Sequence, residues 1–204
     1  MDTQDVTPTT KPDGRLQRSE RSRQAIVVAM LELVEEGNLV PTAQQVAERG
    51  GVGIRSVFRH FEDMESIFAS TSEFVMQRVQ GLFSGGNREG VLAERIVHAT
   101  QQHFNAFESL QQIILSGQVR RWQSATLRKT YAGNQQRLRR NLDSWLPELA
   151  ALPSTRREAA EAIVSFENWQ RLRQHQKLSR NSTVQIAADM LALLSSQDIS
   201  PAKT

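Results

Sequence analysis

Two arginines, a serine and a histidine crowd into one short segment of the chain, residues 50–65, which read GGVGIRSVFRHFEDME. If this segment is helical, Arg55 and Arg59 lie one turn apart on the same side. Ser56 and His60 form a second pair at the same spacing. Arginine presents a planar fork of donors that fits carboxylates, phosphates and the edge of guanine. The face is therefore an ordinary solvated surface, part of a catalytic site, or a surface that reads DNA.

Catalysis finds little support elsewhere in the sequence. The 204 residues include no Cys, which excludes disulfides, thiolate metal sites and a cysteine nucleophile. Neither GxSxG, nor HExxH, nor a Gly-rich phosphate loop occurs. Glu94 and His98 share a helix face at i, i+4, but His103 lies five residues beyond His98 and turns away from it. We expect no catalytic residue, no metal and no cofactor.

The charges of the chain are distributed unevenly. The net charge is +3, which mildly favours an anionic partner. Residues 1–70 hold 8 Lys and Arg against 11 Asp and Glu, whereas residues 71–204 hold 17 against 11. The candidate face thus lies in the more acidic part of the chain. If it binds DNA, it must do so through a few well-placed arginines and not through bulk charge.

Apolar residues recur mostly at helical spacing and strand-like alternation is scarce, so the sequence predicts an all-α fold. With 39% hydrophobic residues, a chain of this length can bury a core. The expected helices cover residues 19–36, a short segment between Thr42 and Gly50, a second short segment that begins near Gly53 or Ile54, and a helix that begins at Glu62 and Asp63 and reaches about residue 83. Further helices are expected over residues 90–107, 109–117, 119–146, 155–176 and 182–196. The glycines of SGGNREG, residues 84–90, interrupt the pattern and mark the expected domain boundary.

Residues 1–18 are polar, contain two prolines and a glycine, and are expected to form a disordered arm. They lack the apolar run of a signal peptide. No stretch of the chain approaches the roughly 20 apolar residues that cross a bilayer. We therefore expect a soluble, unprocessed cytoplasmic protein without a membrane partner.

Two of the expected helices form a helix-turn-helix. Thr42 and Gln45 fit a capping box, in which the Thr42 hydroxyl accepts from the amide three residues on while Gln45 reaches back. Gly50 and Gly51 end this helix, because glycine readily adopts the positive φ of a C-terminal cap. The side chains expected to face the core are Val46, Ala47, Val57 and Phe61.

From residue 23 to residue 68 the chain shows an amphipathic helix, then Gly37, a helix capped by Thr42, and a second short helix followed by Ile67. The turn and the second short helix carry Gly51, Val52, Val57, Phe58, His60 and Phe61. This order resembles the TetR family of bacterial transcriptional regulators. The resemblance covers roughly a quarter of the chain.

The resemblance implies a regulator with two domains. Residues 19–66 are expected to form a three-helix DNA-binding domain, joined to a connecting helix that reaches about residue 83, with the third helix in the major groove. Residues 84–204 are expected to form an all-helical domain that binds a small effector and dimerises. A homodimer would bind a palindromic DNA operator and repress transcription until a small-molecule effector releases it.

The residues expected to contact DNA lie at the start of the first short helix and on the exposed face of the second. The residues expected to contact DNA are Thr42, Gln44, Gly53, Ile54, Arg55, Ser56, Phe58, Arg59 and His60. Arg55 is placed for bidentate hydrogen bonds to guanine O6 and N7. Arg59 and His60 fit phosphates. Ile54 and Phe58 have no side-chain donor, so they can pack only on thymine methyls or sugars.

Three positions depart from the pattern of the family. The family usually has Tyr where this chain has Phe58, Lys where it has Met64, and a Ser or Thr cap where it has Gly53. The tyrosine and the lysine commonly contact phosphates, so two such contacts per subunit are absent or supplied elsewhere. His60 has a competing interpretation as the cap of its helix, and Phe58 as a residue packed into its own domain.

Four arginines stand near the N-terminus, Arg15, Arg18, Arg21 and Arg23. As an N-terminal arm they could follow a minor groove. For Arg15 and Arg18, a disordered tail that merely adds solubility is the competing interpretation.

Basic residues accumulate in the second half of the chain, where no acid occurs between Glu108 and Asp143. A solvated helix is the plain interpretation. The sharper hypothesis is an anionic effector held by one or two arginines between apolar walls. The residues expected to bind the effector are Phe104, Phe107, Arg121, Trp122, Tyr131 and Trp145.

Two apolar stripes near the end of the chain are either intrachain core or a self-association face. The resemblance raises the weight of the dimer face. The residues expected in a dimer interface are Ile163, Phe166, Trp169, Ile186, Met190 and Leu194. A small helical ligand-binding or interaction protein without DNA function is the alternative to a regulator, and a metal-dependent enzyme is a further one.

Overall fold

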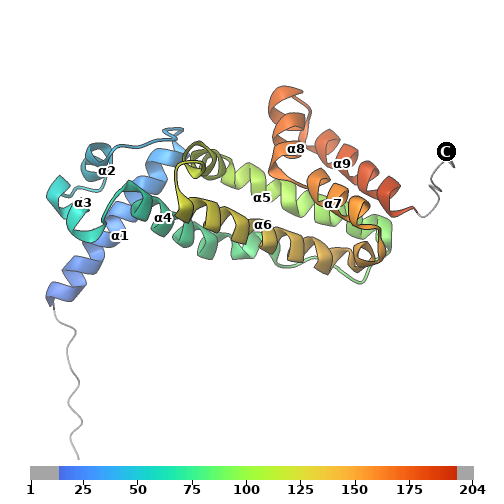
Figure 1. Cartoon of the computed structure of the whole chain (residues 1–204), viewed down its shortest axis with the longest axis horizontal. Helices are drawn as coiled ribbons and strands as arrows, with labels where there is room; N and C mark the ends of the chain where they lie inside the picture. Colours follow the sequence, from blue (N-terminus) through green and yellow to red (C-terminus); the bar gives the residue numbers. More distant parts are fainter. Residues whose placement is uncertain (1–13, 197–204) are drawn as a thin grey trace, which may run out of the picture. The chain divides into compact units, whose positions relative to one another are not determined.

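The computed structural model describes residues 14–196, and these residues form helices and no strand, which confirms the expected all-α class for them (Figure 1). Residues 1–13, which hold most of the expected arm, and residues 197–204 lie outside the described residues. The chain divides into two compact units, and the division falls between Ser72 and Glu73. None of the helices within residues 14–196 has the length and apolar character that a membrane crossing needs.

Between residues 14 and 72, the first unit contains three helices and the start of a fourth. Their bounds are α1 Gly14–Glu35, α2 Ala43–Arg49, α3 Ile54–His60 and α4 Met64–Val79. α1 packs against both α2 and α3, so one long helix supports the two short ones. The buried side chains between them include Ile26, Met30, Val34, Val46, Val57, Phe61 and Ile67.

The second unit is a helical bundle around the long helix α5. Its elements after α4 are η1 Gln80–Phe83, α5 Leu92–Arg121, α6 Ala125–Trp145, η2 Pro147–Ala151, α7 Ser154–Ile163, α8 Phe166–Gln170, η3 Arg171–His175 and α9 Arg180–Ser195. α5 packs against α6, α8 and α9. Phe104, Phe107, Trp145, Phe166 and Trp169 are buried in the core of this bundle.

α1 begins five residues before its expected start and inside the segment that was expected to be disordered. No proline follows Pro12 until well beyond the helix, so nothing in this stretch interrupts the helical hydrogen bonds. Residues 14–21 are all exposed. Their polar composition thus marks an exposed helix surface, and the expectation of disorder was wrong for residues 14–18.

α5 is one continuous helix where the sequence predicted two, over residues 90–107 and 109–117. Ser109 Oγ donates to Asn105 O at 3.1 Å inside the helix and caps no new one. The break comes later, where Ser124 caps α6 by accepting from the Leu127 amide at 3.2 Å. The helix predicted over residues 119–146 therefore starts only at Ala125.

The helix predicted over residues 155–176 is divided into α7, α8 and the π-helical turn η3. Ser165 caps α8 by accepting from the Asn168 amide at 3.2 Å, and Asn168 Nδ2 donates to Ile163 O at 2.7 Å. These polar groups satisfy the backbone at a break that apolar periodicity alone does not reveal.

The loop over residues 84–90 folds onto the end of α6. The Arg88 guanidinium lies 4.3 Å from the centroid of the Trp145 ring and donates to Gly85 O at 2.8 Å. Gly86 has φ +85°, and a Cβ added there would lie 2.3 Å from a ring carbon of Trp145. The loop is therefore packed inside the second unit, which agrees with a division that falls earlier, within α4.

Candidate nucleic-acid interface

α2 begins with the capping box that the sequence predicted. Thr42 Oγ1 accepts from the Gln45 amide at 3.3 Å, and Gln45 Oε1 accepts from the Thr42 amide at 2.9 Å. Val46 and Ala47 are buried against the rest of the unit. Gln44 is exposed on the outer side of the helix, where its amide donates to Glu48 Oε1 at 2.7 Å.

A short turn then directs the chain into α3. Gly51 has φ +62°, a conformation that residues with a side chain rarely adopt, and the Val52 amide donates to Ala47 O at 3.0 Å. Gly53 caps α3 without a side chain. The backbone of the turn thus sets the direction of α3, and the candidate DNA-contacting side chains lie on α3 itself.

α3 separates its residues into an inner and an outer side. Val57 is buried, whereas Ile54 and Phe58 are 41% and 50% exposed. Arg55 and Arg59 are also exposed, and Arg59 Nη2 donates to Ser56 Oγ at 2.7 Å. The helix therefore offers two guanidinium groups and two apolar side chains on a surface that its own unit does not cover.

His60 is less accessible than the sequence suggested. Its side chain is half-buried at the last residue of α3, and among the described residues its Nε2 has no hydrogen-bond partner although it is shielded from solvent. A shielded nitrogen cannot reach a phosphate without a rotation of the ring. The phosphate role predicted for His60 therefore rests on weaker geometry than that of Arg59.

Two other arginines of the first unit have intramolecular partners. Arg49 forms an ion pair with Glu36 at 2.7 Å, and its hydrogen bond holds the pKa of the Glu36 carboxyl below the usual value. The Arg23 guanidinium lies 5.0 Å from the centroid of the Phe61 ring and donates to Ser70 Oγ at 3.1 Å. These contacts give Arg23 a role inside its own unit, and its expected role in an N-terminal arm stays a prediction.

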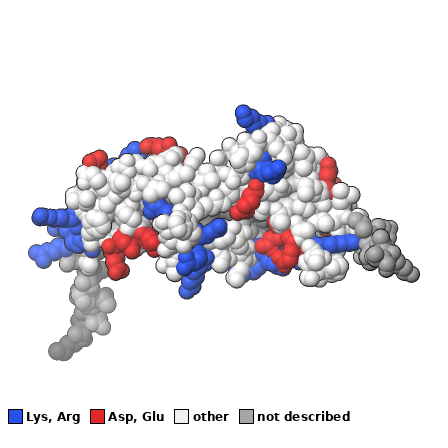
Figure 2. Space-filling view, turned by 45° about the horizontal axis from the view of Figure 1, so that its top comes forward, with Lys and Arg blue, Asp and Glu red and all other residues white. Residues whose placement is uncertain are grey.

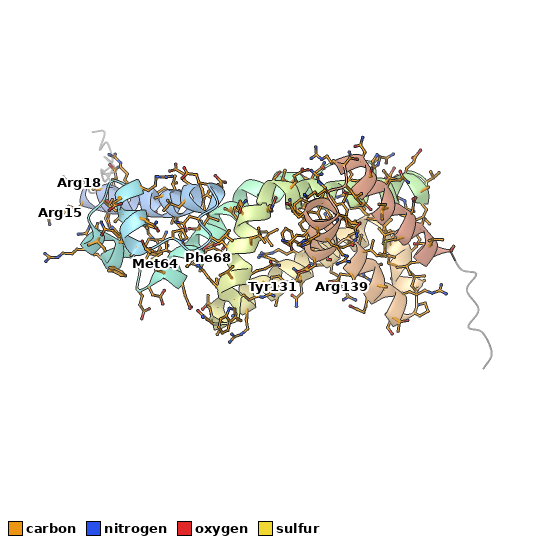
Figure 3. The ribbon with its side chains drawn as sticks, turned by 90° about the horizontal axis from the view of Figure 1, so that it is seen from above. Arg15, Arg18, Met64, Phe68, Tyr131 and Arg139 are labelled. Carbon is orange, nitrogen blue, oxygen red and sulfur yellow. The ribbon has the colours of Figure 1, made fainter. Side chains whose placement is uncertain are left out.

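Arginine side chains protrude from the end of the first unit that carries α3 and the first turns of α1 (Figure 2). Arg15 and Arg18 belong to these turns and lie at the same end (Figure 3). Sequence reasoning treated this stretch as an arm and missed its helical order. The signal was present, because residues 15–24 contain neither Pro nor Gly.

The residues predicted to bind an effector do not gather in one place. Phe104, Phe107 and Trp145 are core side chains, while Trp122 is 72% exposed. Two of the six do meet, because the Arg121 guanidinium lies 3.8 Å from the centroid of the Tyr131 ring. Apolar side chains of this size are as typical of a helical core as of a ligand wall, and sequence alone does not distinguish them.

A residue that the sequence did not single out completes this cluster. Glu167 Oε1 accepts from Tyr131 OH at 3.3 Å and from Gln118 Nε2 at 3.4 Å. The group joins α5, α6 and α8, which are far apart in sequence. Only the tertiary structure could reveal it.

The predicted dimer residues separate into two groups. Ile163, Phe166 and Trp169 are buried in the core of their own unit, so they are not available to a second subunit. On α9, Ile186 and Met190 are 37% and 42% exposed, and Leu194 is half-buried. Leu193, absent from the predicted set, is 67% exposed beside them.

Comparisons with known proteins support the fold. No protein-family model matches the chain, and no curated protein matches its sequence. A transcriptional regulator from Rhodococcus sp. Rha1 superposes with a TM-score of 0.64 at 18% identity, over 86% of this chain and 95% of that chain. A TetR transcription regulator from Haloarcula marismortui ATCC 43049 superposes with a TM-score of 0.61 at 12% identity, over 88% of this chain and 97% of that chain.

The chain therefore has the fold of TetR-type transcriptional regulators, with a helix-turn-helix unit followed by a helical bundle. Within residues 14–196, no three His, Asp or Glu side chains form a group that could hold a metal ion.

Proposed function

We propose that the protein is a DNA-binding transcriptional regulator that binds a palindromic operator as a homodimer. The observation that carries the proposal is the division of α3, with Val57 buried and Arg55, Phe58 and Arg59 exposed. A short helix held by α1 from behind and bearing guanidinium groups in front suits the major groove, which admits an α-helix. The fold shared with TetR-type regulators supports the same conclusion.

The exposed side chains of α3 contact different parts of the DNA. Arg55 lies in the first turn of α3 and forms bidentate hydrogen bonds to guanine O6 and N7. Arg59 lies one turn later and binds a phosphate, while Ile54 and Phe58 pack on thymine methyls or sugars. Thr42 and Gln44, at the start of α2, add backbone contacts that position the unit but carry no sequence information.

Dimerisation follows from the exposed apolar residues of α9. Ile186, Met190 and Leu193 lie at spacings of four and three residues, on a side of α9 that its own bundle leaves exposed. Pairing of this side with its copy about a two-fold axis makes an isologous interface. The two-fold axis relates the α3 helices of the two subunits. To enter successive major grooves of a palindromic operator, these helices must lie about 34 to 36 Å apart.

A small-molecule effector regulates DNA binding by favouring one spacing of the two α3 helices. The effector weakens DNA binding only by its differential affinity for the two states. Arg121, Tyr131 and Glu167 form the polar cluster of the bundle that an effector would meet, and Arg121 supplies charge for an anionic one. The resulting function is repression relieved by a ligand.

Selection of bound fragments from a pool of random duplexes tests the proposal. The full chain is expected to enrich an inverted repeat, with half-sites separated by about one helical turn. With Arg55→Ala, the selected sequences are expected to lose the preference for guanine at the base pair that Arg55 contacts in the parent complex. Enrichment of no sequence, or of a sequence without two-fold symmetry, would show that the proposal is wrong.

A further inference from the structure

His103 is a buried histidine of α5 that the proposed function does not use. Its side chain is 1% exposed. Nδ1 bonds to Ala99 O at 2.9 Å, and because a carbonyl oxygen only accepts, Nδ1 carries the proton of the neutral ring. Nε2 is shielded from solvent and has no hydrogen-bond partner among residues 14–196. A second proton would have to bind at this shielded nitrogen, where it brings a positive charge away from water.

The groups around the ring favour its neutral form. The rings of Phe83, in η1, and Phe107, on α5, have their centroids 5.9 Å and 6.3 Å from that of His103. Burial lowers the pKa of His103, whereas the carbonyl groups of Ala99 and Leu138 raise it, and no charged side chain of residues 14–196 contributes to the shift. Protonation is therefore easier when the ring is exposed to water than when it is buried.

η1 contacts the ring through Phe83 and is weakly anchored to the bundle. No residue of η1 is buried, whereas α5 and α6 supply much of the core. Asn141 Nδ2 donates to Phe83 O at 3.2 Å. Arg88 Nη2 donates to the same oxygen at 3.5 Å and places one positive charge beside the contact. Of these three elements, η1 thus has the least packing to lose when His103 becomes charged.

We propose that protonation of His103 releases η1 from the bundle and thereby makes operator binding sensitive to acid. The effect on DNA rests on the proposed function, whereas the release of η1 does not. Below about pH 6.5 an exposed imidazole binds a proton that the buried ring does not accept. Acid therefore favours the arrangement in which Phe83 has left the ring and water reaches Nε2. At neutral pH the closed contact is favoured.

α4 connects η1 to the first unit. It begins at Met64, in the first unit, and ends at Val79, directly before Gln80 of η1. Ile67 and Phe68 of α4 are buried in the first unit, so α4 contributes to the core of the DNA-binding unit. A release of η1 frees the end of this helix. Two arrangements of η1 then give two affinities for DNA, and pH sets their populations.

Hydrogen exchange of the full chain between pH 7.5 and pH 5.5 tests the release. The readout is the protection factor of residues 74–84, which corrects for the pH dependence of exchange itself. Below pH 6.5 the protection of the parent is expected to fall by up to about tenfold per pH unit, because one proton separates the two arrangements. His103→Gln is expected to keep its protection. His175→Gln changes an exposed histidine of η3 and should respond like the parent.

The same measurement separates local release from unfolding of the whole bundle. The amides in the middle of α5 are expected to keep their protection while residues 74–84 lose theirs. An equal loss in both segments, or an equal loss in the parent and in His103→Gln, would overturn the proposal.

Two variants of η1 test the contact in a chain that keeps His103. Phe83→Ala uncovers the ring, so the pKa of His103, followed by NMR, is expected to rise toward its ordinary value of 6.5. Leu82→Ala truncates a partly exposed neighbour in the same element and is expected to leave this pKa unchanged. Circular dichroism verifies that both variants are folded. An equal pKa in Phe83→Ala and in the parent would show that η1 does not control access to the ring.

Titration of the duplex that the chain enriches measures the consequence for DNA. Both chains in this comparison carry His60→Gln, because His60 belongs to α3 and its own titration must not contribute. Between pH 6.5 and pH 5.5 the affinity of this chain is expected to fall by up to about tenfold per subunit, and addition of His103→Gln should remove the fall.

The outcomes separate this inference from the proposed function. A parent chain that enriches no duplex refutes the proposed function, and the hydrogen-exchange result still decides whether His103 releases η1. A chain that releases η1 in acid but keeps its affinity for the duplex shows that the switch does not reach α3, and the proposed control of operator binding is then wrong.

Discussion

The side chains of α3 show which features of a binding face can be predicted from residue spacing and which cannot. The alternation between Val57 and its exposed neighbours was predictable, because helical spacing alone assigns side chains to faces. The shielding of His60 Nε2 was not predictable from helical spacing, which assigns a face but not the exposure of a single atom. Residue identity thus predicts which groups border the face, while tertiary packing decides which of them are accessible.

Phe58 stands where the TetR pattern that the sequence resembles usually has a tyrosine. Its ring is 50% exposed, so a hydroxyl added at its edge would reach solvent or DNA without disturbing the core. Phe58→Tyr is expected to strengthen binding by about 0.5–1.5 kcal/mol per subunit through a new hydrogen bond to a phosphate. Because tyrosine is neutral, the salt slope should not change. Anisotropy titrations with Phe58→Leu as control measure both quantities, and unchanged affinity would mean that no phosphate lies beside this ring.

His103 should make stability depend on pH. Burial lowers the pKa of this imidazole from its usual value of 6.5, although Nδ1 bonds to Ala99 O at 2.9 Å. Well above pH 6.5 the ring is neutral in both states. Below it the unfolded chain binds a proton that the folded chain refuses, so stability falls as the pH falls, by up to about 1.4 kcal/mol per pH unit.

Urea unfolding of the parent and of His103→Gln between pH 7.5 and pH 5 measures this effect. The parent is expected to lose more stability than the variant over that range. Equal losses would show that another group controls the acid sensitivity.

Whole elements were predictable where local signals mark both ends. α2 is an example, because Thr42 and Gln45 mark its start and the glycines of the turn mark its end. α5 is the opposite case, because the interruption expected near residue 108 does not exist and the true break depends on Ser124. Caps formed by one serine are weak signals in sequence, since serine also occurs inside helices, as Ser109 does in α5.

The loop over residues 84–90 depends on Gly86. A Cβ at this position would meet the Trp145 ring, and φ +85° is unfavourable for any side chain. Gly86→Ala is therefore expected to destabilise the chain by about 1–3 kcal/mol. Chemical denaturation measures the change, and Gly81→Ala is the control because nothing lies within 4 Å of an added Cβ there. Equal stability of the two variants would show that the loop does not need its packing on Trp145.

At the level of the whole molecule, sequence alone gave the fold class but not the division between core and interface. Two apolar stripes looked equivalent, yet Trp169 is 1% exposed and Leu193 is 67% exposed. α5 packs against both α8 and α9, and α9 buries Ala187 and Leu191 on one side while it leaves Leu193 exposed on another; which side is buried depends on contacts between residues far apart in sequence.

The exposed apolar side of α9 predicts that one charged substitution there prevents dimerisation. Met190→Asp places a charge within the apolar surface formed with Ile186 and Leu193, and burial of an unpaired charge is costly. The variant is expected to sediment as a monomer at micromolar concentration, where the parent sediments as a dimer. Ala192→Asp, an exposed position on the same helix outside this surface, should leave the dimer intact. A monomeric parent, or a dimeric Met190→Asp variant, would remove α9 from the interface.

The most direct test of α3 as a DNA-reading helix is the ratio of specific to nonspecific affinity before and after Arg55→Ala. Titrations at one salt concentration would compare the enriched duplex with a scrambled duplex, with Arg140→Ala as the charge-matched control. Arg55→Ala removes a bidentate contact to guanine, so it should lower the ratio by the equivalent of about 1–3 kcal/mol of binding free energy per half-site. Arg140→Ala should leave the ratio unchanged. An unchanged ratio in Arg55→Ala, or a parent chain that binds both duplexes equally, would contradict the account.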